Sequence, residues 1–196
     1  MTATGLGQAK TWISEGRAQV DALDRAISDA VATTPTPTLD RFLVRLSNAA
    51  NRSRLWFAIA AAVALVGGPR GRRAAAEAVA SIGLASGVSN LVLKPAAPRR
   101  RPQAPAGRAV PTRMVRRPTS SSFPSGHAAS AFAFASTMGE EVPVTWVPLH
   151  VTAALVGYAR VHTGVHYASD VMVGALTGAL CGWTVRRVAA RLVPRA

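Results

Sequence analysis

The stretch LWFAIAAAVALVGG, residues 55 to 68, has no charged side chain and places Trp56 near its start. A helix of that composition has no polar face to turn toward water, and a tryptophan at its edge is typical of an anchor at a membrane interface. A second apolar stretch, AAAEAVASIGLASGVSNLVL at residues 74 to 93, has Glu77 near one end and Asn90 near the other. Both stretches favour helices in a membrane.

Three further apolar stretches follow, at residues 127–138, 144–158 and 167–185. All are rich in Gly, Ala and Ser, which allow helices to approach closely in lipid. Several are shorter than the roughly 20 residues that cross a hydrocarbon layer. We therefore predict an all-α, polytopic membrane helical bundle of about five spans. A soluble helical bundle is the alternative, and it is disfavoured because nearly uncharged helices offer little polar surface to water.

The N-terminal residues differ from this apolar part. Residues 11 to 31 have apolar side chains at helical spacing, and TPTPT at residues 34 to 38 ends that pattern. Residues 39 to 50 have a second apolar stripe beside Arg41 and Arg45, so this helix either lies flat on an anionic bilayer or packs on the fold. The expected regions are an N-terminal amphipathic and linker region, a membrane domain and a basic tail, at residues 1–38, 39–188 and 189–196.

The chain has a formal net charge of +14, which predicts an anionic partner such as nucleic acid, lipid headgroups or a phosphorylated substrate. No Asp or Glu lies between Glu77 and Glu140. That interval contains a loop at residues 95–122, rich in Pro, Arg and Ser, with no aromatic side chain to stack a base. Nucleic acid is therefore not the expected partner. The single cysteine, Cys181, excludes an internal disulfide and a cysteine-based zinc site.

Three short groups contain the residues with chemical potential. They are KPAAPRRRP at 94–102, PSGH at 124–127 and ARVHTGVHYASD at 159–170. Successive spans alternate in direction, so the end of the second, the start of the third, the end of the fourth and the start of the fifth share one side of the membrane. We therefore expect all three groups to meet at one face.

A phosphoryl group is the ligand that these side chains suit. Lys94, Arg101 and Arg160 offer an ammonium and two guanidinium groups for its oxygens. A helix that starts at Ser125 and Gly126 adds backbone N–H donors, and the glycine lets a ligand come close. These five residues are the predicted phosphate-binding set.

Two histidines and one aspartate supply the predicted catalytic set. His166 and Asp170 are four residues apart, so on a helix the carboxylate can orient the imidazole. In the predicted scheme His166 attacks phosphorus to form a phosphohistidine, His127 protonates the leaving oxygen, and water then releases phosphate. Each residue also has a structural interpretation, as an interfacial anchor, a helix cap or a hydrogen-bonded pair.

A metal site is the other interpretation of this region. His162, His166 and Asp170 are spaced to share one helical face and could hold an ion. The dense cationic surround disfavours a divalent ion, and HTG at residues 162–164 suits a loop better than a helix. We therefore predict no metal. His150 lies inside the fourth stretch and is expected to be a structural polar residue.

The spacing of the three groups resembles the type 2 phosphatidic acid phosphatase superfamily, which includes bacterial acid phosphatases and vanadium haloperoxidases. Its signature is K-x6-R-P, P-S-G-H and S-R-x5-H-x3-D, and the motifs fall here in the same order. The matching residues are Lys94 with Arg101 and Pro102, Pro124 to His127, and Arg160 with His166 and Asp170. Ala159 stands where the signature has serine, which is not one of the charged residues. The resemblance covers about residues 39 to 188.

The resemblance implies a helical core of the acid phosphatase/vanadium haloperoxidase type, no cofactor, and metal-independent hydrolysis of a phosphomonoester or diphosphate with the roles given above. Membrane members generally have six spans, so residues 39–50 are expected to stand in for a missing first span. Two other functions stay open: a vanadium-dependent haloperoxidase-like enzyme, and a non-catalytic membrane protein that binds anionic lipid.

A lipid phosphate is the expected substrate, because the site opens at the level of the headgroups. The candidates are phosphatidate, phosphatidylglycerol phosphate, a polyprenyl phosphate or diphosphate, and a polyprenyl-phosphoryl sugar phosphate. Abundant Ala, Arg, Val and Gly with little Lys is typical of a GC-rich bacterial genome. This favours a multi-pass protein of a bacterial inner membrane, of actinobacterial type. The chain also resembles candidate phosphatases that remove the 5-phosphate of a decaprenyl-phosphoryl ribose in such organisms, and this resemblance implies the narrower substrate expectation. Arginines flank both faces, so orientation stays open, as does the oligomeric state.

Overall fold

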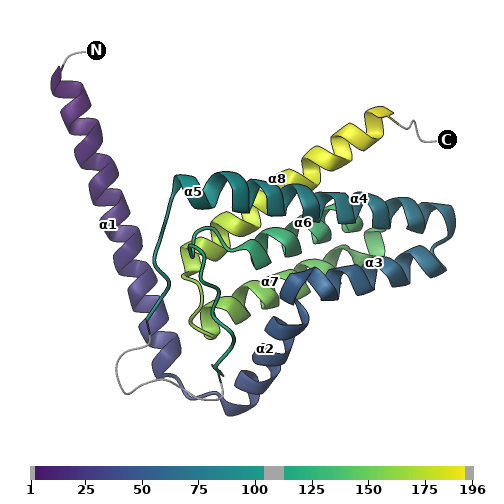
Figure 1. Cartoon of the computed structure of the whole chain (residues 1–196), viewed down its shortest axis with the longest axis horizontal. Helices are drawn as coiled ribbons and strands as arrows, with labels where there is room; N and C mark the ends of the chain where they lie inside the picture. Colours follow the sequence, from purple (N-terminus) through teal and green to yellow (C-terminus); the bar gives the residue numbers. More distant parts are fainter. Residues whose placement is uncertain (1–2, 104–112, 193–196) are drawn as a thin grey trace.

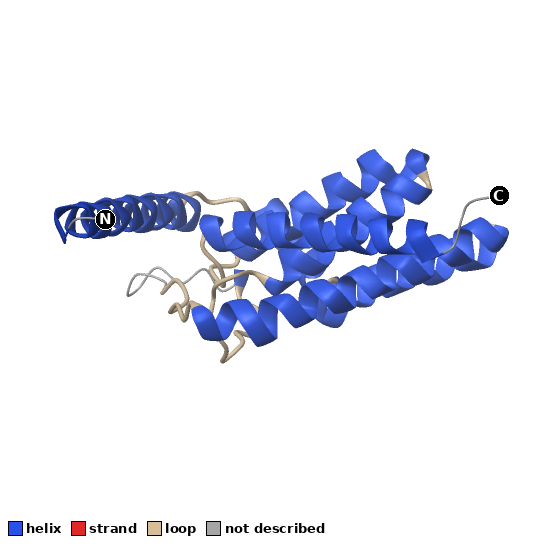
Figure 2. Ribbon diagram, turned by 90° about the horizontal axis from the view of Figure 1, so that it is seen from above, coloured by secondary structure: helices blue, strands red, loops and turns tan. Residues whose placement is uncertain are grey.

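The computed structural model describes residues 3–103 and 113–192, and within these ranges the chain forms helices and no strand (Figure 2). The α-helices are α1 (Ala3–Thr33), α2 (Pro37–Ala49), α3 (Arg54–Val66), α4 (Gly68–Gly87), α5 (Lys94–Ala96), α6 (Gly126–Glu141), α7 (Trp146–His162) and α8 (Ala168–Leu192). Short 3-10 and π segments are η1 (Asn51–Ser53), η2 (Val88–Leu93) and η4 (Pro143–Thr145). Figure 1 shows α3, α4, α6, α7 and α8 in one bundle, with most of α1 standing apart. The predicted all-α bundle is confirmed.

Fewer helices than the five apolar stretches meet the length and composition of a membrane span within the described residues. Two helical segments are long and apolar enough to cross a membrane, Gly68–Ala96 with 29 residues and Ala168–Leu192 with 25. The pair α2 and α3 passes the same test together but is bent by 60°. Within the described ranges α6 and α7 have 16 and 17 residues, short of the roughly 20 that span hydrocarbon. The five predicted stretches are therefore all helical, but five is only approximate as a count of spans.

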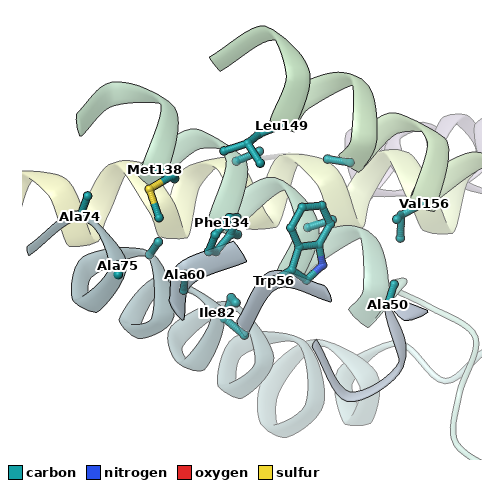
Figure 3. Close-up of a cluster of buried hydrophobic side chains, with 14 residues drawn as sticks. Ala50, Trp56, Ala60, Ala74, Ala75, Ile82, Phe134, Met138, Leu149 and Val156 are labelled. Atoms are coloured by element: carbon teal, nitrogen blue, oxygen red, sulfur yellow. The ribbon is translucent and has the colours of Figure 1, made fainter. Parts of the chain in front are cut away.

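Helix α6 lies at the centre of the bundle, in contact with α4, α7 and α8. Its side chains are mostly small, and Ala128, Ala131 and Ala135 are fully buried. Phe134 and Met138 fill the remaining space between the helices (Figure 3). An alanine-rich central helix lets its neighbours approach closely, which brings the ends of four helices together at the site described below.

Trp56 was predicted to be an interfacial anchor, and this prediction is wrong. Its side chain is 1% exposed, and its ring centroid lies 5.3 Å from that of Phe134 in the core (Figure 3). The segment η1, which joins α2 to α3, contacts α6. The first turn of α3 therefore faces the centre of the bundle rather than its edge.

Glycines of α8 let its backbone pack on that of α6. A Cβ atom added at Gly174 would lie 2.5 Å from the carbonyl oxygen of Ser125, and one at Gly178 would lie 2.2 Å from that of Ala129. No side chain fits at these distances. The close approach places the start of α6 beside the start of α8, where Ser125 N–H donates to the Asp170 carbonyl oxygen at 2.9 Å.

The charged residue that interrupts the second apolar stretch belongs to a buried ionic cluster. Glu77 accepts from Arg186 of α8 at 2.7 Å and from Arg73 at 2.8 Å. Glu141 also pairs with Arg186. Arg186 is sixteen positions beyond Asp170 in α8, about 24 Å along the helix at 1.5 Å per residue, so this cluster lies at the other end of the bundle from the site.

The helix at residues 37–49 packs on the fold, which decides between its two interpretations. α2 contacts α7, and its Leu43 and Ser47 are fully buried. On its outer side Phe42 remains half exposed. α2 continues into α3 across the bend, and only together do the two reach the length and composition of a membrane span. The last part of α1 contacts α7 and α8, next to the start of α8.

Candidate active site

The three sequence groups converge on one cavity of about 230 Å³. Five of the eight predicted site residues line it: Lys94, Arg101, Gly126, His127 and His166. The other three, Ser125, Arg160 and Asp170, are buried behind its wall. The cavity lies where the end of α4–α5, the start of α6 and the loop between α7 and α8 meet, as the alternation of spans predicted.

His166 sits in the loop between α7 and α8 and is 3% exposed. Its Nε2 atom lies 3.2 Å from Nη1 of Arg101. A guanidinium can only donate hydrogen bonds, so Nε2 must be the acceptor and the neutral ring must hold its proton on Nδ1. The geometry therefore presents an unprotonated Nε2 to the cavity.

Asp170 lies behind His166 and is fully buried in the first turn of α8. Its Oδ2 accepts from the Tyr167 N–H at 2.9 Å and lies 3.5 Å from Nδ1 of His166. That distance is long for a hydrogen bond, and such contacts commonly tighten when substrate binds. The carboxylate is thus in place to fix the tautomer and to stabilise positive charge on the ring.

The surroundings of His166 keep its imidazole neutral. Burial lowers its pKa to about 4, and the positive charges of Arg160 and Arg101 add to this effect, although Asp170 acts in the opposite direction. A ring with that pKa is almost entirely uncharged at neutral pH. Attack on a phosphoryl group then needs no loss of a proton, only the release of the bond from Arg101 to Nε2.

His127, the second predicted catalytic histidine, donates a hydrogen bond from Nε2, whereas His166 accepts one there. His127 Nε2 lies 3.0 Å from Oδ1 of Asn51, whose amide nitrogen donates to Asn48 at 3.3 Å. The amide oxygen therefore faces the imidazole, and His127 Nε2 is the donor. Asn51 was missed in the sequence analysis, because nothing in its local sequence marks it. It lies in η1, next to Arg52 and Ser53, which both adopt left-handed backbone conformations at the cavity wall.

The predicted cations are held differently from one another. Lys94 donates to Asn90 at 2.8 Å, which explains the amide near the end of the second apolar stretch. Arg101 donates to the carbonyl oxygens of Val165 at 2.8 Å and Ser121 at 3.1 Å. These bonds direct both side chains to the cavity wall.

Arg160 lies deeper than Lys94 and Arg101. It is 2% exposed, and its Nη1 donates to Ser47 of α2 at 2.6 Å. Its Nε has no hydrogen-bond partner within the described part of the chain. A buried N–H without a partner is costly, so a ligand oxygen at this point would be favourable.

Arg99 is a further site residue that sequence reasoning missed. Its Nη1 donates to Asp170 Oδ1 at 2.9 Å and to Ser169 Oγ at 2.8 Å, and its Nη2 donates to Asp24 at 2.8 Å and to Asp21. Arg99 thus joins helix α1 to the carboxylate behind His166. The sequence contains three consecutive arginines at residues 99–101, but it does not indicate which of them pairs with Asp24 and Asp170.

His162 points away from the cavity and pairs with Asp40 of α2. Its Nε2 lies 2.7 Å from Asp40 Oδ1, which also accepts from Arg113 Nε at 2.8 Å. In the described ranges no group of three or more His, Cys, Asp or Glu side chains is placed to hold a metal ion. His150 bonds to the Trp146 carbonyl oxygen at 2.8 Å and stacks on its ring, so it is a structural polar residue.

Comparison with known proteins gives one consistent picture. Residues 74–194 match the model of the PAP2 superfamily. The chain is 38% identical over 135 residues to decaprenylphosphoryl-5-phosphoribose phosphatase of Mycobacterium tuberculosis. This match covers 68% of this chain and 70% of that protein. A shorter match, 40% over 65 residues to lipid A 1-phosphatase of Porphyromonas gingivalis, covers 31% of this chain and only 15% of that protein.

Two solved structures share the fold. One is a transmembrane PAP2-type phosphatidylglycerolphosphate phosphatase from Bacillus subtilis, with a TM-score of 0.69 and 23% identity over 91% of this chain and 90% of that one. The other is LpxE of Aquifex aeolicus, with a TM-score of 0.66 and 26% identity over 85% of this chain and 93% of that one.

Proposed function

Since the chain belongs to the PAP2 superfamily and is a membrane phosphatase of that family, we propose that it hydrolyses a lipid phosphate through a phosphohistidine on His166. One observation above all supports this proposal. A donor-only guanidinium lies 3.2 Å from His166 Nε2, so this nitrogen is unprotonated, and a bound phosphoryl group can take the place of the guanidinium at its lone pair, with Asp170 on the opposite side of the ring.

The first half of the reaction breaks the ester bond. His166 Nε2 attacks phosphorus, and the bond from phosphorus to the oxygen of the lipid breaks with its electron pair moving to that oxygen. His127 acts here as an imidazolium, protonated on both ring nitrogens once the negative phosphate is bound; it gives the Nε2 proton to the leaving oxygen and becomes neutral, keeping the proton on Nδ1. Asp170 stabilises the positive charge that develops on His166.

The second half regenerates the enzyme. His127, now unprotonated at Nε2, takes a proton from water as the water oxygen attacks phosphorus. The N–P bond breaks, its electron pair returns to Nε2 of His166, and inorganic phosphate leaves. Lys94, Arg101 and the N–H groups at the start of α6 offset negative charge on the equatorial oxygens in both halves. The Nε of Arg160, which lacks a partner among the described residues, would bind one of these oxygens.

The substrate that the comparisons favour is a polyprenyl-phosphoryl sugar phosphate. The Mycobacterium tuberculosis relative acts, by its name, on decaprenylphosphoryl-5-phosphoribose, and its match extends over 68% of this chain. We place the enzyme in a bacterial inner membrane as a multi-pass protein, with the cavity at headgroup level. No step of the proposed mechanism uses a metal or a cofactor.

Phosphate release from a panel of lipid phosphates in detergent micelles tests this proposal. His166→Ala should lose at least about a thousandfold in kcat and should form no acid-labile phosphoenzyme. The control His150→Ala, outside the cavity, should keep the wild-type rate. EDTA should have no effect, and vanadate should inhibit. A wild-type rate in His166→Ala would refute the phosphohistidine, and loss of activity in EDTA would refute the metal-independent route.

A further inference from the structure

A second cavity, of about 650 Å³, opens beside the proposed catalytic cavity. It lies between the loop segments 98–103 and 117–121. Arg101, Pro118 and Ser120 line both cavities, so the two share a wall. The proposed chemistry with His166 uses only the smaller cavity and leaves this one without a role.

The walls of this second cavity are bonded to each other. Ser122 N–H donates to the Arg99 carbonyl oxygen at 3.0 Å, and Arg99 N–H donates to Ser121 Oγ at 3.0 Å. Arg117 Nη1 also donates to the Pro102 carbonyl oxygen at 3.1 Å. These bonds hold the two loop segments at a fixed separation, so the space between them is a built feature of the loop.

Among the described residues, the lining of the cavity includes four arginines and no acidic residue. Of its four arginines, Arg99 is turned away to the carboxylates of α1 and α8, as described above. The other three, Arg100, Arg101 and Arg117, make no ion pair with a carboxylate in residues 3–103 and 113–192.

Like charges are therefore crowded at the shared wall. Burial lowers the pKa of Arg101, the carboxylate of Asp170 opposes this, and the positive charge of Arg117 adds to the lowering. An anion placed between Arg100 and Arg117 would relieve this repulsion. Guanidinium groups bind phosphate oxygens through paired hydrogen bonds, so a phosphate is the anion that they suit.

We propose that this Arg100–Arg117 cavity is a subsite for a second phosphate group of the same substrate molecule. The inference rests on the proposed function, in which the terminal phosphate meets His166 in the smaller cavity. Because Arg101 lines both cavities, the two phosphates must be joined by a short linker. The preferred substrates are then lipids in which a phosphodiester or diphosphate carries the group that bears the terminal phosphate.

The headgroup of a neighbouring anionic phospholipid has the same chemistry as a second phosphate of the substrate. The two sources differ in their dependence on the substrate. If the cavity binds a phosphate of the substrate, loss of Arg100 and Arg117 lowers kcat/KM only for substrates with two phosphates. If the cavity binds a separate headgroup, loss of the two arginines lowers kcat/KM for every substrate, and only when anionic lipid is present.

The test compares two substrates in a neutral detergent, a polyprenyl-phosphoryl ribose 5-phosphate with two phosphates and a polyprenyl monophosphate with one. The measured quantity is the ratio of kcat/KM for the first to kcat/KM for the second. The double variant Arg100→Gln/Arg117→Gln should lower this ratio at least about tenfold, mainly through KM, because two charge-assisted contacts are lost. The matched control is Arg116→Gln, an exposed arginine of the same loop outside both cavities, which should keep the wild-type ratio.

A wild-type ratio in the double variant would overturn the subsite. So would stimulation of the one-phosphate reaction by phosphatidylglycerol vesicles that is lost in the double variant, because that result assigns the cavity to a separate headgroup. If wild-type enzyme hydrolyses neither substrate, the proposed function itself fails, which is a different result from an unchanged ratio.

Discussion

Replacing Asp24 by asparagine should slow the proposed reaction although Asp24 lines neither cavity. Its carboxylate is 2% exposed and accepts from the Ser169 N–H at 3.0 Å, from the Ser169 hydroxyl and from Arg99 Nη2 at 2.8 Å. Arg99 shares its other nitrogen with Asp170. Asp24, on α1, thus competes with Asp170 for the guanidinium of Arg99.

The size of the effect follows from the bonds that change. Asparagine has nearly the same shape, but it removes the charge from one buried bond to a guanidinium, which is worth about 1.5–3 kcal/mol. We expect the free energy of unfolding to fall by about 2 kcal/mol. Arg99 should then pair more strongly with Asp170, which weakens the support of that carboxylate for positive charge on His166. A loss of about tenfold in kcat, close to 1.4 kcal/mol, is expected with little change in KM.

Steady-state phosphate release and thermal unfolding in detergent measure the two effects separately. Asp21→Asn is the matched control, because the Asp21 side chain also pairs with Arg99 but is 38% exposed. This control should lose less than about threefold in kcat, because exposed pairs contribute little. The reasoning is refuted if folded Asp24→Asn keeps the wild-type kcat, or if only its KM changes.

Three further predictions concern other parts of the molecule. The pKa of His166, about 4 when folded, lies below the value of about 6.5 expected when unfolded, so the unfolded chain binds more protons between these values. Stability should therefore fall as pH drops from about 6.5 to 4, and thermal unfolding of His166→Gln should show a weaker fall. Asn51→Ala should lower kcat about tenfold in phosphate-release assays, because it removes the acceptor that orients His127. Gly178→Ala should lower the thermal midpoint by several degrees, because its Cβ would lie 2.2 Å from the carbonyl oxygen of Ala129; an unchanged midpoint would contradict the close packing of α6 and α8.

The helical part of the fold could be predicted because its signals are local. Uncharged stretches rich in alanine and glycine became α3, α4, α6, α7 and α8, and small residues on α8 do pack on the α6 backbone. Trp56 was misplaced because an aromatic residue at the edge of an apolar stretch has the same local pattern whether it faces lipid or core. The number of spans could be given only approximately, because helix length depends on where the chain turns, and α6 and α7 end after 16 and 17 residues.

The candidate site was predictable to the extent that it depends on spacing. Lys94, Arg101, Gly126, His127 and His166 line one cavity, as the alternation of helix direction implied. Arg160 was expected beside Lys94 and Arg101, and it lies behind them against Ser47 of α2. The direction of a long side chain depends on its packing partners, and spacing along the chain does not report them.

By itself, the sequence determined the helical class of the protein, the three charged groups and the membrane face on which they meet. Only the tertiary structure decided the partners of the two histidines. Asn51 reaches His127 across 76 positions, and Arg101 reaches His166 across 65. Helical periodicity specifies neighbours three and four residues apart, whereas these contacts depend on the crossing of whole helices. The protonation pattern of the site, with a lone pair on His166 and a donor on His127, follows from those distant partners.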